Sequence, residues 1–315
     1  MLRSVLVETA RRLPLIGPRL QRLHAHERFC PLGHFYSPIV SAHDIRERAS
    51  ELFDTSADAV TGVNLDTEQQ LRVLDEISPL CRDWPFPDHK PQDGAGSSLR
   101  YWTVNGFFQT LDGHALLGML RRLRPRRVVE VGSGFSSALM LDARDLYLGG
   151  PAAGPHLTFI EPYPERLESL LRPGDRLDTT IIREGVQRAP LSLYEQLEPN
   201  DILFIDSSHV GKLGSDVNHL FFEALPRLKP GVVVHVHDVF WPFTYPREWI
   251  EEGRYWNEAF YIRMLLLCND TFRIEFWCDH LNVKHRDRLR RALSGPGPFA
   301  DDFQGGASIW LRRER

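Results

Sequence analysis

The chain has 315 residues, enough for one large α/β domain with an extension or for two modest domains. Its composition, 42% hydrophobic and 25% charged, is typical of a soluble globular protein, and a net charge of −4 favours no binding of nucleic acid through its phosphates. No run approaches the roughly 18 apolar residues of a membrane span, so we expect a cytoplasmic protein without a transmembrane segment.

The N-terminal third is expected to be a helical extension. Residues 1–23 have an amphipathic pattern broken by prolines, which is compatible with a peripheral membrane contact as well as with packing on the same domain or on a partner in an oligomer. Residues 66–81 have apolar side chains at helical spacing, and residues 83–98 are rich in Pro, Asp and Gly. We therefore predict an extension over 1–98, capping the substrate side, and a main domain over 99–315.

From Gly113 onward, helical patterns alternate with short apolar runs. The expected helices cover residues 114–123, 136–148, 165–171 and 216–228. The expected strands cover residues 127–131, 156–161, 179–182, 201–206, 231–237, 272–278 and 307–311. Strands that are apolar on both faces and separated by helices predict an α/β fold: a Rossmann-like, seven-stranded, mostly parallel sheet with helices on both faces.

The four cysteines form no Cys-x-x-Cys pair, and this spacing indicates neither a zinc site nor a disulfide framework. We expect buried free thiols in a reducing cytosol.

The first strand runs directly into Gly132-Ser133-Gly134, where glycines let the backbone turn tightly and approach a ligand. A dinucleotide site would place an acid about 20 residues further on, whereas the next acid at a strand end, Glu161, comes later. Glu130 precedes the loop and points toward it in this interpretation. A carboxylate there would repel a pyrophosphate and favour a cationic, amino-bearing ligand.

In these motifs the sequence resembles the class I S-adenosylmethionine-dependent methyltransferases, and the resemblance extends over about residues 100–245. The resemblance rests on Glu130-x-Gly132-x-Gly134, Ile160-Glu161-Pro162, Asp206 and the strand at 231–238. It implies that the glycine loop lies against the methionine part of S-adenosylmethionine, that Glu161 holds the ribose hydroxyls, and that the turn at 185–187 lies near adenine. The implied cofactor residues are Glu130, Gly132, Ser133, Gly134, Glu161, Gly185, Val186 and Asp206.

Polar residues also follow the fourth and fifth strands, whose ends should lie about 5 Å apart. Their order is similar to that of catechol-type, metal-assisted O-methyltransferases, which implies a divalent cation on Asp206, His237 and Asp238. A histidine in that set is a departure, because magnesium prefers oxygen, and it favours a transition metal or no metal. Alternatively, His209 or His237 acts as a general base.

The leading hypothesis is therefore an S-adenosylmethionine-dependent methyltransferase acting on oxygen of a small molecule or sugar, with His209, His237 and Asp238 at the catalytic centre. The aromatic loop over residues 240–246 forms an acceptor pocket, or packs over the sheet edge. Two alternatives stay open. One is a nicotinamide-dependent oxidoreductase on a Rossmann fold, and the other is a catalytically silent binding module.

Overall fold

The computed structural model describes residues 29–90, 99–108, 110–293 and 305–315. The chain divides into two units, Met1–Asp54 and Thr55–Arg315. In the first unit, turns over residues 29–39 precede two short helices, α3 (Ala42–Glu47) and α4 (Ala49–Leu52). The Ser41 hydroxyl accepts a hydrogen bond from the Asp44 N–H at 2.9 Å and so caps α3. The amphipathic stretch over residues 1–23 lies outside the described residues.

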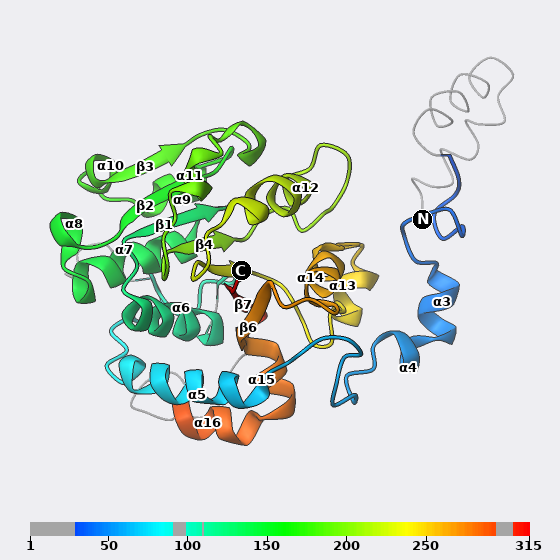
Figure 1. Cartoon of the computed structure of the whole chain (residues 1–315). Coiled ribbons are helices and arrows are strands. Elements are labelled where there is room, and N and C mark those ends of the chain that lie inside the picture. The colour runs from blue at the N-terminus through cyan, green and yellow to red at the C-terminus, as the bar shows by residue number, and fades with distance from the viewer. Residues whose placement is uncertain (1–28, 91–98, 109, 294–304) are drawn as a thin grey trace, which may run out of the picture. The chain divides into compact units, whose positions relative to one another are not determined.

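The second unit contains the seven-stranded sheet, in the order β3-β2-β1-β4-β5-β7-β6 (Figure 1). Its strands are β1 (Arg127–Val131), β2 (His156–Ile160), β3 (Thr179–Ile182), β4 (Ile202–Ile205), β5 (Val233–Val236), β6 (Phe272–Trp277) and β7 (Ile309–Arg313). Strands β1 to β5 pair in parallel, and β7 pairs antiparallel with both β5 and β6. The predicted mostly parallel, Rossmann-like sheet is confirmed, and chain order reverses between β1 and β4.

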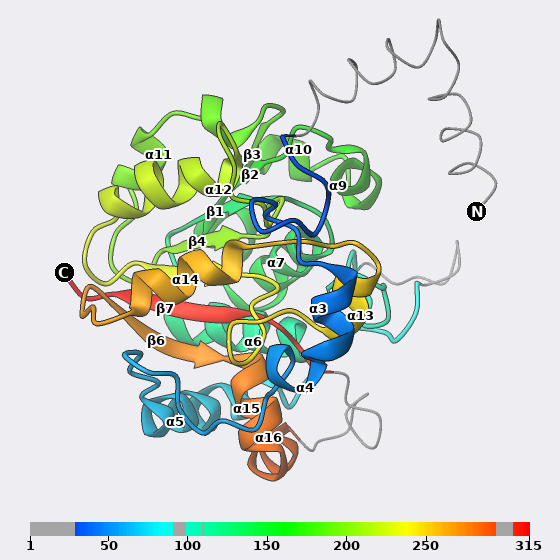
Figure 2. The same cartoon turned by 90° about the vertical axis from the view of Figure 1, so that its right-hand side faces the viewer.

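Side chains of successive strand residues enter two separate cores, one on each face of the sheet. In β1, Val128 packs into the core that contains α6 and α7, whereas Val129 and Val131 pack into the opposite core. Figure 2 shows α14 alongside β7 and β6. The helices of this unit are α5 (Thr67–Ile77), η1 (Ser78–Cys81), α6 (Thr110–Leu123), α7 (Phe135–Tyr147), α8 (Gly150–Ala153), α9 (Glu165–Leu170), α10 (Asp175–Asp178), η2 (Val186–Arg188), α11 (Ser192–Glu195), α12 (Asp216–His219), η3 (Leu220–Ala224), η4 (Leu225–Arg227), α13 (Arg247–Glu251), α14 (Glu258–Leu266), α15 (Cys278–Lys284) and α16 (Arg286–Leu293).

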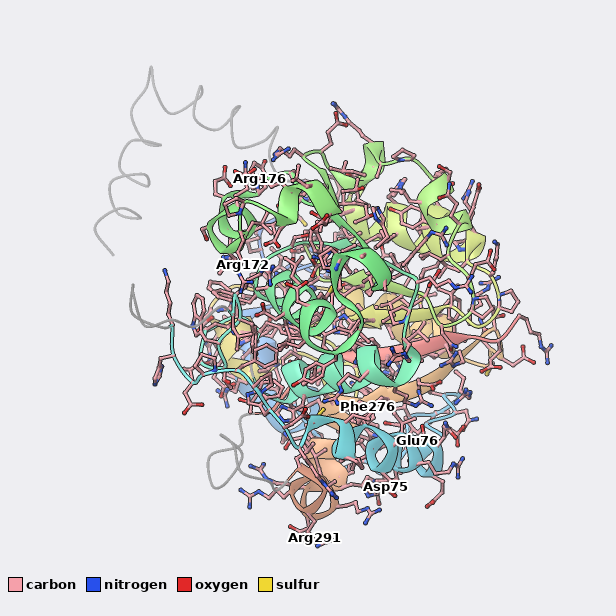
Figure 3. The ribbon with its side chains drawn as sticks, turned by 90° about the vertical axis from the view of Figure 1, so that its left-hand side faces the viewer. Asp75, Glu76, Arg172, Arg176, Phe276 and Arg291 are labelled. Atoms are coloured by element: carbon pink, nitrogen blue, oxygen red, sulfur yellow. The ribbon has the colours of Figure 1, made fainter. Side chains whose placement is uncertain are left out.

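Helix α5 belongs to the second unit, although the sequence-based boundary at residue 98 assigns it to the extension. The Trp277 N–H, at the end of β6, donates to Gln70 Oε1 of α5 at 3.1 Å. On the outer side of α5, Asp75 pairs with Arg288 and Glu76 pairs with Arg122; Figure 3 labels the two acids. The division between units therefore falls near residue 54. That the extension caps the substrate side stays a prediction.

Helix α6 begins at Thr110, four residues earlier than expected, and β5 begins at Val233, two residues later than expected. Two further elements also differ from their expected form. The helix expected over 216–228 consists of α12, a π-helical turn (η3) and a 3₁₀ turn (η4) that contains Pro226, which has no N–H to donate to a continuous helix. Strand β7 begins at Ile309, two positions later than expected. Its preceding N–H groups, on Ala307 and Ser308, donate instead to the carboxylate of Asp112 at 3.1 and 3.0 Å.

The four cysteines are free thiols, but the prediction that they are buried holds only for Cys81 and Cys278, because Cys30 is partly exposed and Cys268 is exposed. Among the described helices, none is long and apolar enough to cross a membrane.

Candidate active site

The turn after β1 has the strand–loop–helix order that the sequence predicts, because Gly132–Gly134 lead directly into α7 at Phe135. Gly132 has a φ of 82°, and a Cβ on it would lie 1.7 Å from the carbonyl oxygen of Asp206. Any side chain would therefore collide with the backbone that follows β4. Glycine is required for the loop to approach the end of the neighbouring strand this closely.

Glu130 lies behind this loop and is fully buried. Ser136 Oγ donates to one of its carboxylate oxygens at 2.6 Å. Ser137 Oγ donates to the other oxygen and accepts from the Gly134 N–H at 2.9 Å. Burial raises the pKa of Glu130 to about 8, although the serine hydroxyls act in the opposite direction. The sequence-based interpretation has Glu130 pointing toward a ligand. In the structure Glu130 does not line the cavity next to the glycine loop, and its carboxylate instead binds the serine hydroxyls at the start of α7.

Glu161 follows β2 and reaches the same loop. Its Oε2 accepts from the Ser133 N–H at 3.0 Å, and its Oε1 accepts from the Tyr163 N–H at 2.8 Å. Two backbone donors thus orient the carboxylate, and each oxygen keeps a lone pair for a further donor. The arrangement suits a ligand that presents two neighbouring hydroxyl groups.

The glycine loop, Glu161 and the ends of β4 and β5 surround one cavity of about 750 Å³. The predicted cofactor residues that line it are Gly132, Ser133, Gly134, Glu161 and Asp206. Ser133 Oγ and Ser207 Oγ are buried and find no hydrogen-bond partner among the described residues, so both are available to a polar ligand. Gly185 and Val186 do not line the cavity, and Val186 is buried in the core.

Three donor groups converge beyond the ends of β4 and β5. His209 Nε2 lies 3.4 Å from Asp206 Oδ1 and 3.6 Å from Asp238 Oδ2. Each of these residues offers one donor atom, and the three atoms lie within 4.8 Å of one another. The spacing is compatible with a metal ion, and this group contains His209 where the sequence-based set contains His237.

Opposite charges stabilise each other at this centre. Burial lowers the pKa of His209, but its hydrogen bonds with Asp206 and Glu258 outweigh that effect and hold the pKa well above its ordinary value. Burial raises the pKa of Asp206, yet the nearby charges of His237 and His209 lower it overall. We therefore expect an imidazolium at position 209 beside an ionised Asp206 when no other cation is bound.

The two histidines of β5 and its end differ in role. His235 is fully buried and stacks on Phe204, with ring centroids 3.7 Å apart, so it is a core residue as the sequence indicates. His237 is also buried but lines the cavity, and its Nε2 lies 3.6 Å from Asp238 Oδ1. Its Nδ1 finds no hydrogen-bond partner within the described part of the chain.

One residue at this centre has no sequence signal. Glu258, in the first turn of α14, is buried, and its Oε2 lies 2.9 Å from His209 Nδ1. It belongs to no motif, and it is distant in sequence from the residue that it contacts. Only packing of α14 beside the end of β4 brings the two together.

Aromatic side chains form one wall of the cavity. Phe240, Trp249 and Trp256 all line it, and Trp249 packs edge-on against the other two rings. The guanidinium of Arg254 lies 4.7 Å from the centre of the Trp249 ring. This wall leads to His209, whose ring centroid is 4.4 Å from that of Trp256.

Comparison with known proteins identifies the class to which this fold and site belong. Residues 129–239 match the family model described as a methyltransferase domain. An uncharacterized protein of Archaeoglobus fulgidus is 34% identical over 175 residues, which cover 55% of this chain and 75% of the relative. The chain therefore belongs to the methyltransferases, with its methyltransferase domain over residues 129–239.

Solved structures of methyltransferases are also similar. The O-methyltransferase TomG of Streptomyces achromogenes, in complex with S-adenosylmethionine, is 17% identical, with 80% of this chain and 92% of that chain covered and a TM-score of 0.40. An O-methyltransferase from Bacillus cereus is 16% identical, with 78% and 91% covered and a TM-score of 0.40. A TDP-rhamnose 3′-O-methyltransferase is 16% identical, with 80% and 96% covered and a TM-score of 0.40.

Proposed function

We propose that this methyltransferase transfers the methyl group of S-adenosylmethionine to a hydroxyl oxygen of a small-molecule or sugar acceptor. The observation that carries the proposal is the convergence of Asp206, His209, His237 and Asp238 on the cavity that the glycine loop and Glu161 border. Transfer from a sulfonium is a direct displacement, so the enzyme must align the acceptor atom with the methyl carbon and remove its proton. For a hydroxyl acceptor, a histidine can take the proton and the carboxylates can hold a cation beside the oxygen.

In this proposal the cofactor lies along the glycine loop. Gly132 and Gly134 let the methionine part approach the backbone, and Ser133 Oγ and Asp206 offer it polar contacts. Glu161 accepts hydrogen bonds from the two ribose hydroxyls. Adenine would lie toward the turn at 185–187, which follows β3. The acidic cavity favours a cofactor that carries a sulfonium and an ammonium group.

The acceptor would lie between the aromatic wall and Asp238. Trp256 and Phe240 offer flat apolar faces to a ring. His237 takes the proton of the hydroxyl group, because His209 already carries a proton when no other cation is bound. A divalent cation held by Asp206, Asp238 and a histidine would lower the pKa of the acceptor hydroxyl. The donor atoms fit such an ion, because all three lie within 4.8 Å of one another.

Glu161→Ala is expected to weaken binding of S-adenosylhomocysteine at least tenfold, because two charge-assisted hydrogen bonds to the ribose are lost. Isothermal titration calorimetry measures this directly. Glu165→Ala, a change at an exposed position of α9, is the matched control and should bind like the unchanged protein. Equal affinity of both variants for S-adenosylhomocysteine would contradict the proposed ribose contact.

Oxygen methylation is tested with a panel of sugars and phenols and with isotopically labelled S-adenosylmethionine, followed by mass spectrometry of the products. We expect a product with a methyl ether, and we expect Asp238→Asn to lower its rate of formation at least a hundredfold. A methyl group on nitrogen or carbon would contradict the proposal. Cofactor binding without turnover on the whole panel would favour a binding module.

We also propose a cytoplasmic location, which the four free thiols support. An oligomer, and a peripheral membrane contact through residues 1–23, remain predictions. Size-exclusion chromatography with light scattering tests the first. Sedimentation with anionic vesicles, with and without those residues, tests the second.

A further inference from the structure

The two histidines near Asp238 are held in different ways. His209 is anchored on one side of its ring, where Nδ1 lies 2.9 Å from Glu258 Oε2, and its other nitrogen lies 3.4 Å from Asp206 Oδ1 and 3.6 Å from Asp238 Oδ2. His237 has no such anchor, because its Nδ1 finds no partner among the described residues. Only the His209 ring is therefore fixed with a nitrogen facing both carboxylates.

The start of α14 holds Glu258 rigidly against the His209 loop. The N–H groups of Asn257 and Glu258 donate to the His209 carbonyl oxygen at 3.0 and 3.2 Å. The Asn257 side chain also bonds both backbone groups of Gly211, accepting from its N–H at 2.6 Å and donating to its carbonyl at 3.2 Å. These contacts maintain His209 in the left-handed region, with a φ of 59°.

The spacing of the three donors suits a metal ion. Two ligands bound to one ion at about 2.1 Å in a tetrahedral site lie about 3.4 Å apart, close to the distances from His209 Nε2 to the two carboxylates. A second observation points the same way. The buried side chain of His237 lines this cavity with an unpartnered nitrogen, which indicates a centre built to receive a further polar or charged group.

We propose that Glu258 is a positioning residue that keeps the His209 Nδ1–H on its carboxylate and directs Nε2 toward Asp206 and Asp238. His209, rather than His237, is then the nitrogen ligand of the cation. A carboxylate behind a ligating histidine fixes its tautomer and raises its basicity as a ligand. With one imidazole and two carboxylates, the centre takes a transition metal ion such as Mn²⁺, Co²⁺ or Zn²⁺ in preference to Mg²⁺.

This inference rests on the cation of the proposed function, and its test needs neither acceptor nor cofactor. The full chain is treated with a chelator, and Co²⁺, Mn²⁺ and Mg²⁺ are titrated separately by calorimetry, with the Co²⁺ absorption spectrum as a second readout. We expect Co²⁺ to bind at least tenfold more tightly than Mg²⁺. Glu258→Gln should weaken Co²⁺ binding by about 10–100-fold and change its spectrum, while Mg²⁺ binding changes little.

Glu248→Gln, at an exposed position of α13, is the matched control and should leave Co²⁺ binding unchanged. Circular dichroism and thermal unfolding verify that each variant is folded. If Glu258→Gln does not fold, His209→Ala and His237→Ala decide the question, because only the first should abolish Co²⁺ binding. Equal Co²⁺ affinity in Glu258→Gln and the unchanged protein, loss of Co²⁺ in His237→Ala alone, or equal affinities for Mg²⁺ and Co²⁺ would each overturn the inference.

Failure of this inference and failure of the proposed function give different experimental results. A protein that binds Co²⁺ through His209 and Glu258 but forms no methyl ether keeps this inference and loses oxygen methylation. A protein that forms methyl ethers without binding any of the three ions loses this inference alone.

Discussion

Glu130 illustrates how a single buried carboxyl group makes the stability of the glycine loop depend on pH. Its pKa rises from an ordinary value of 4.5 to about 8 because burial disfavours the charged form. Between these two values the folded protein retains a proton that the unfolded chain releases. The free energy of unfolding therefore falls as the pH rises through this window, and the loss is complete above about pH 8.

Glu130→Gln should remove this dependence, because an amide does not titrate in this range. Relative to the unchanged protein, the variant is expected to gain stability as the pH rises from 5 to 8, by up to about 1.4 kcal/mol per pH unit. Urea unfolding at several pH values measures the difference. Parallel stability curves for the two proteins would show that Glu130 ionises normally in the fold.

Gly132 determines whether the glycine loop can form at all. Gly132→Ala should destabilise the protein by at least about 2 kcal/mol, because the added Cβ collides with the Asp206 carbonyl and φ is positive. Thermal unfolding and S-adenosylhomocysteine calorimetry measure the two consequences. Gly174→Ala is the control, since no atom lies within 4 Å of its added Cβ and its φ is −69°. A stable Gly132→Ala protein with full affinity would contradict this account of the loop.

At the scale of elements, a buried arginine joins the segment before α6 to two helices. Arg100 contacts Asp142 of α7 at 2.7 Å and Asp175 of α10 at 2.5 Å, and the three side chains are at most 5% exposed. Asp142 also accepts from the backbone N–H groups of Arg100 and Tyr101. This segment continues into residues 106–108, which line the cavity, so the ion pairs support one wall of the site.

Arg100→Ala should lower the free energy of unfolding by about 3–5 kcal/mol, because it removes the nearest cation of two buried carboxylates. Arg247→Ala removes an exposed pair with Glu251 and should cost less than about 0.5 kcal/mol. Urea unfolding compares the two variants. If they are equally stable, the buried network does not hold the segment in place.

The sequence predicts helices and strands correctly where a single pattern of apolar residues dominates the segment. Strands β1 to β4 agree with their predicted ranges to within a residue at each end. The side chains of β1, β2 and β4 enter apolar cores on both faces, whereas Ile181 and Ile182 of the edge strand β3 pack partly buried against these cores. The break within the helix expected over 216–228 has a local cause, Pro226. The late start of β7 depends instead on contacts that are remote in sequence. The Asp112 carboxylate, which competes for the N–H groups before β7, is such a contact.

At the scale of the whole molecule, the sheet and the entire candidate site lie within Thr55–Arg315. We predict that this unit folds by itself and binds S-adenosylhomocysteine within about threefold of the full chain. Expression of residues 55–315, followed by thermal unfolding and calorimetry, tests this. A fragment from residue 99 lacks α5, which packs against β6, and should be less stable. If the longer fragment does not fold, the first unit is part of the core.

The local pattern of the chain was sufficient to identify the sheet, the glycine bend and the polar ends of β4 and β5, because apolar periodicity and glycine positions are set by neighbouring residues. Folding in three dimensions decided that Glu130 faces the hydroxyls of α7, that His209 lies between the two aspartates, and that Glu258 stands behind it. These arrangements depend on how helices pack against strand ends. Such packing joins residues far apart in the chain, and no short-range pattern encodes it.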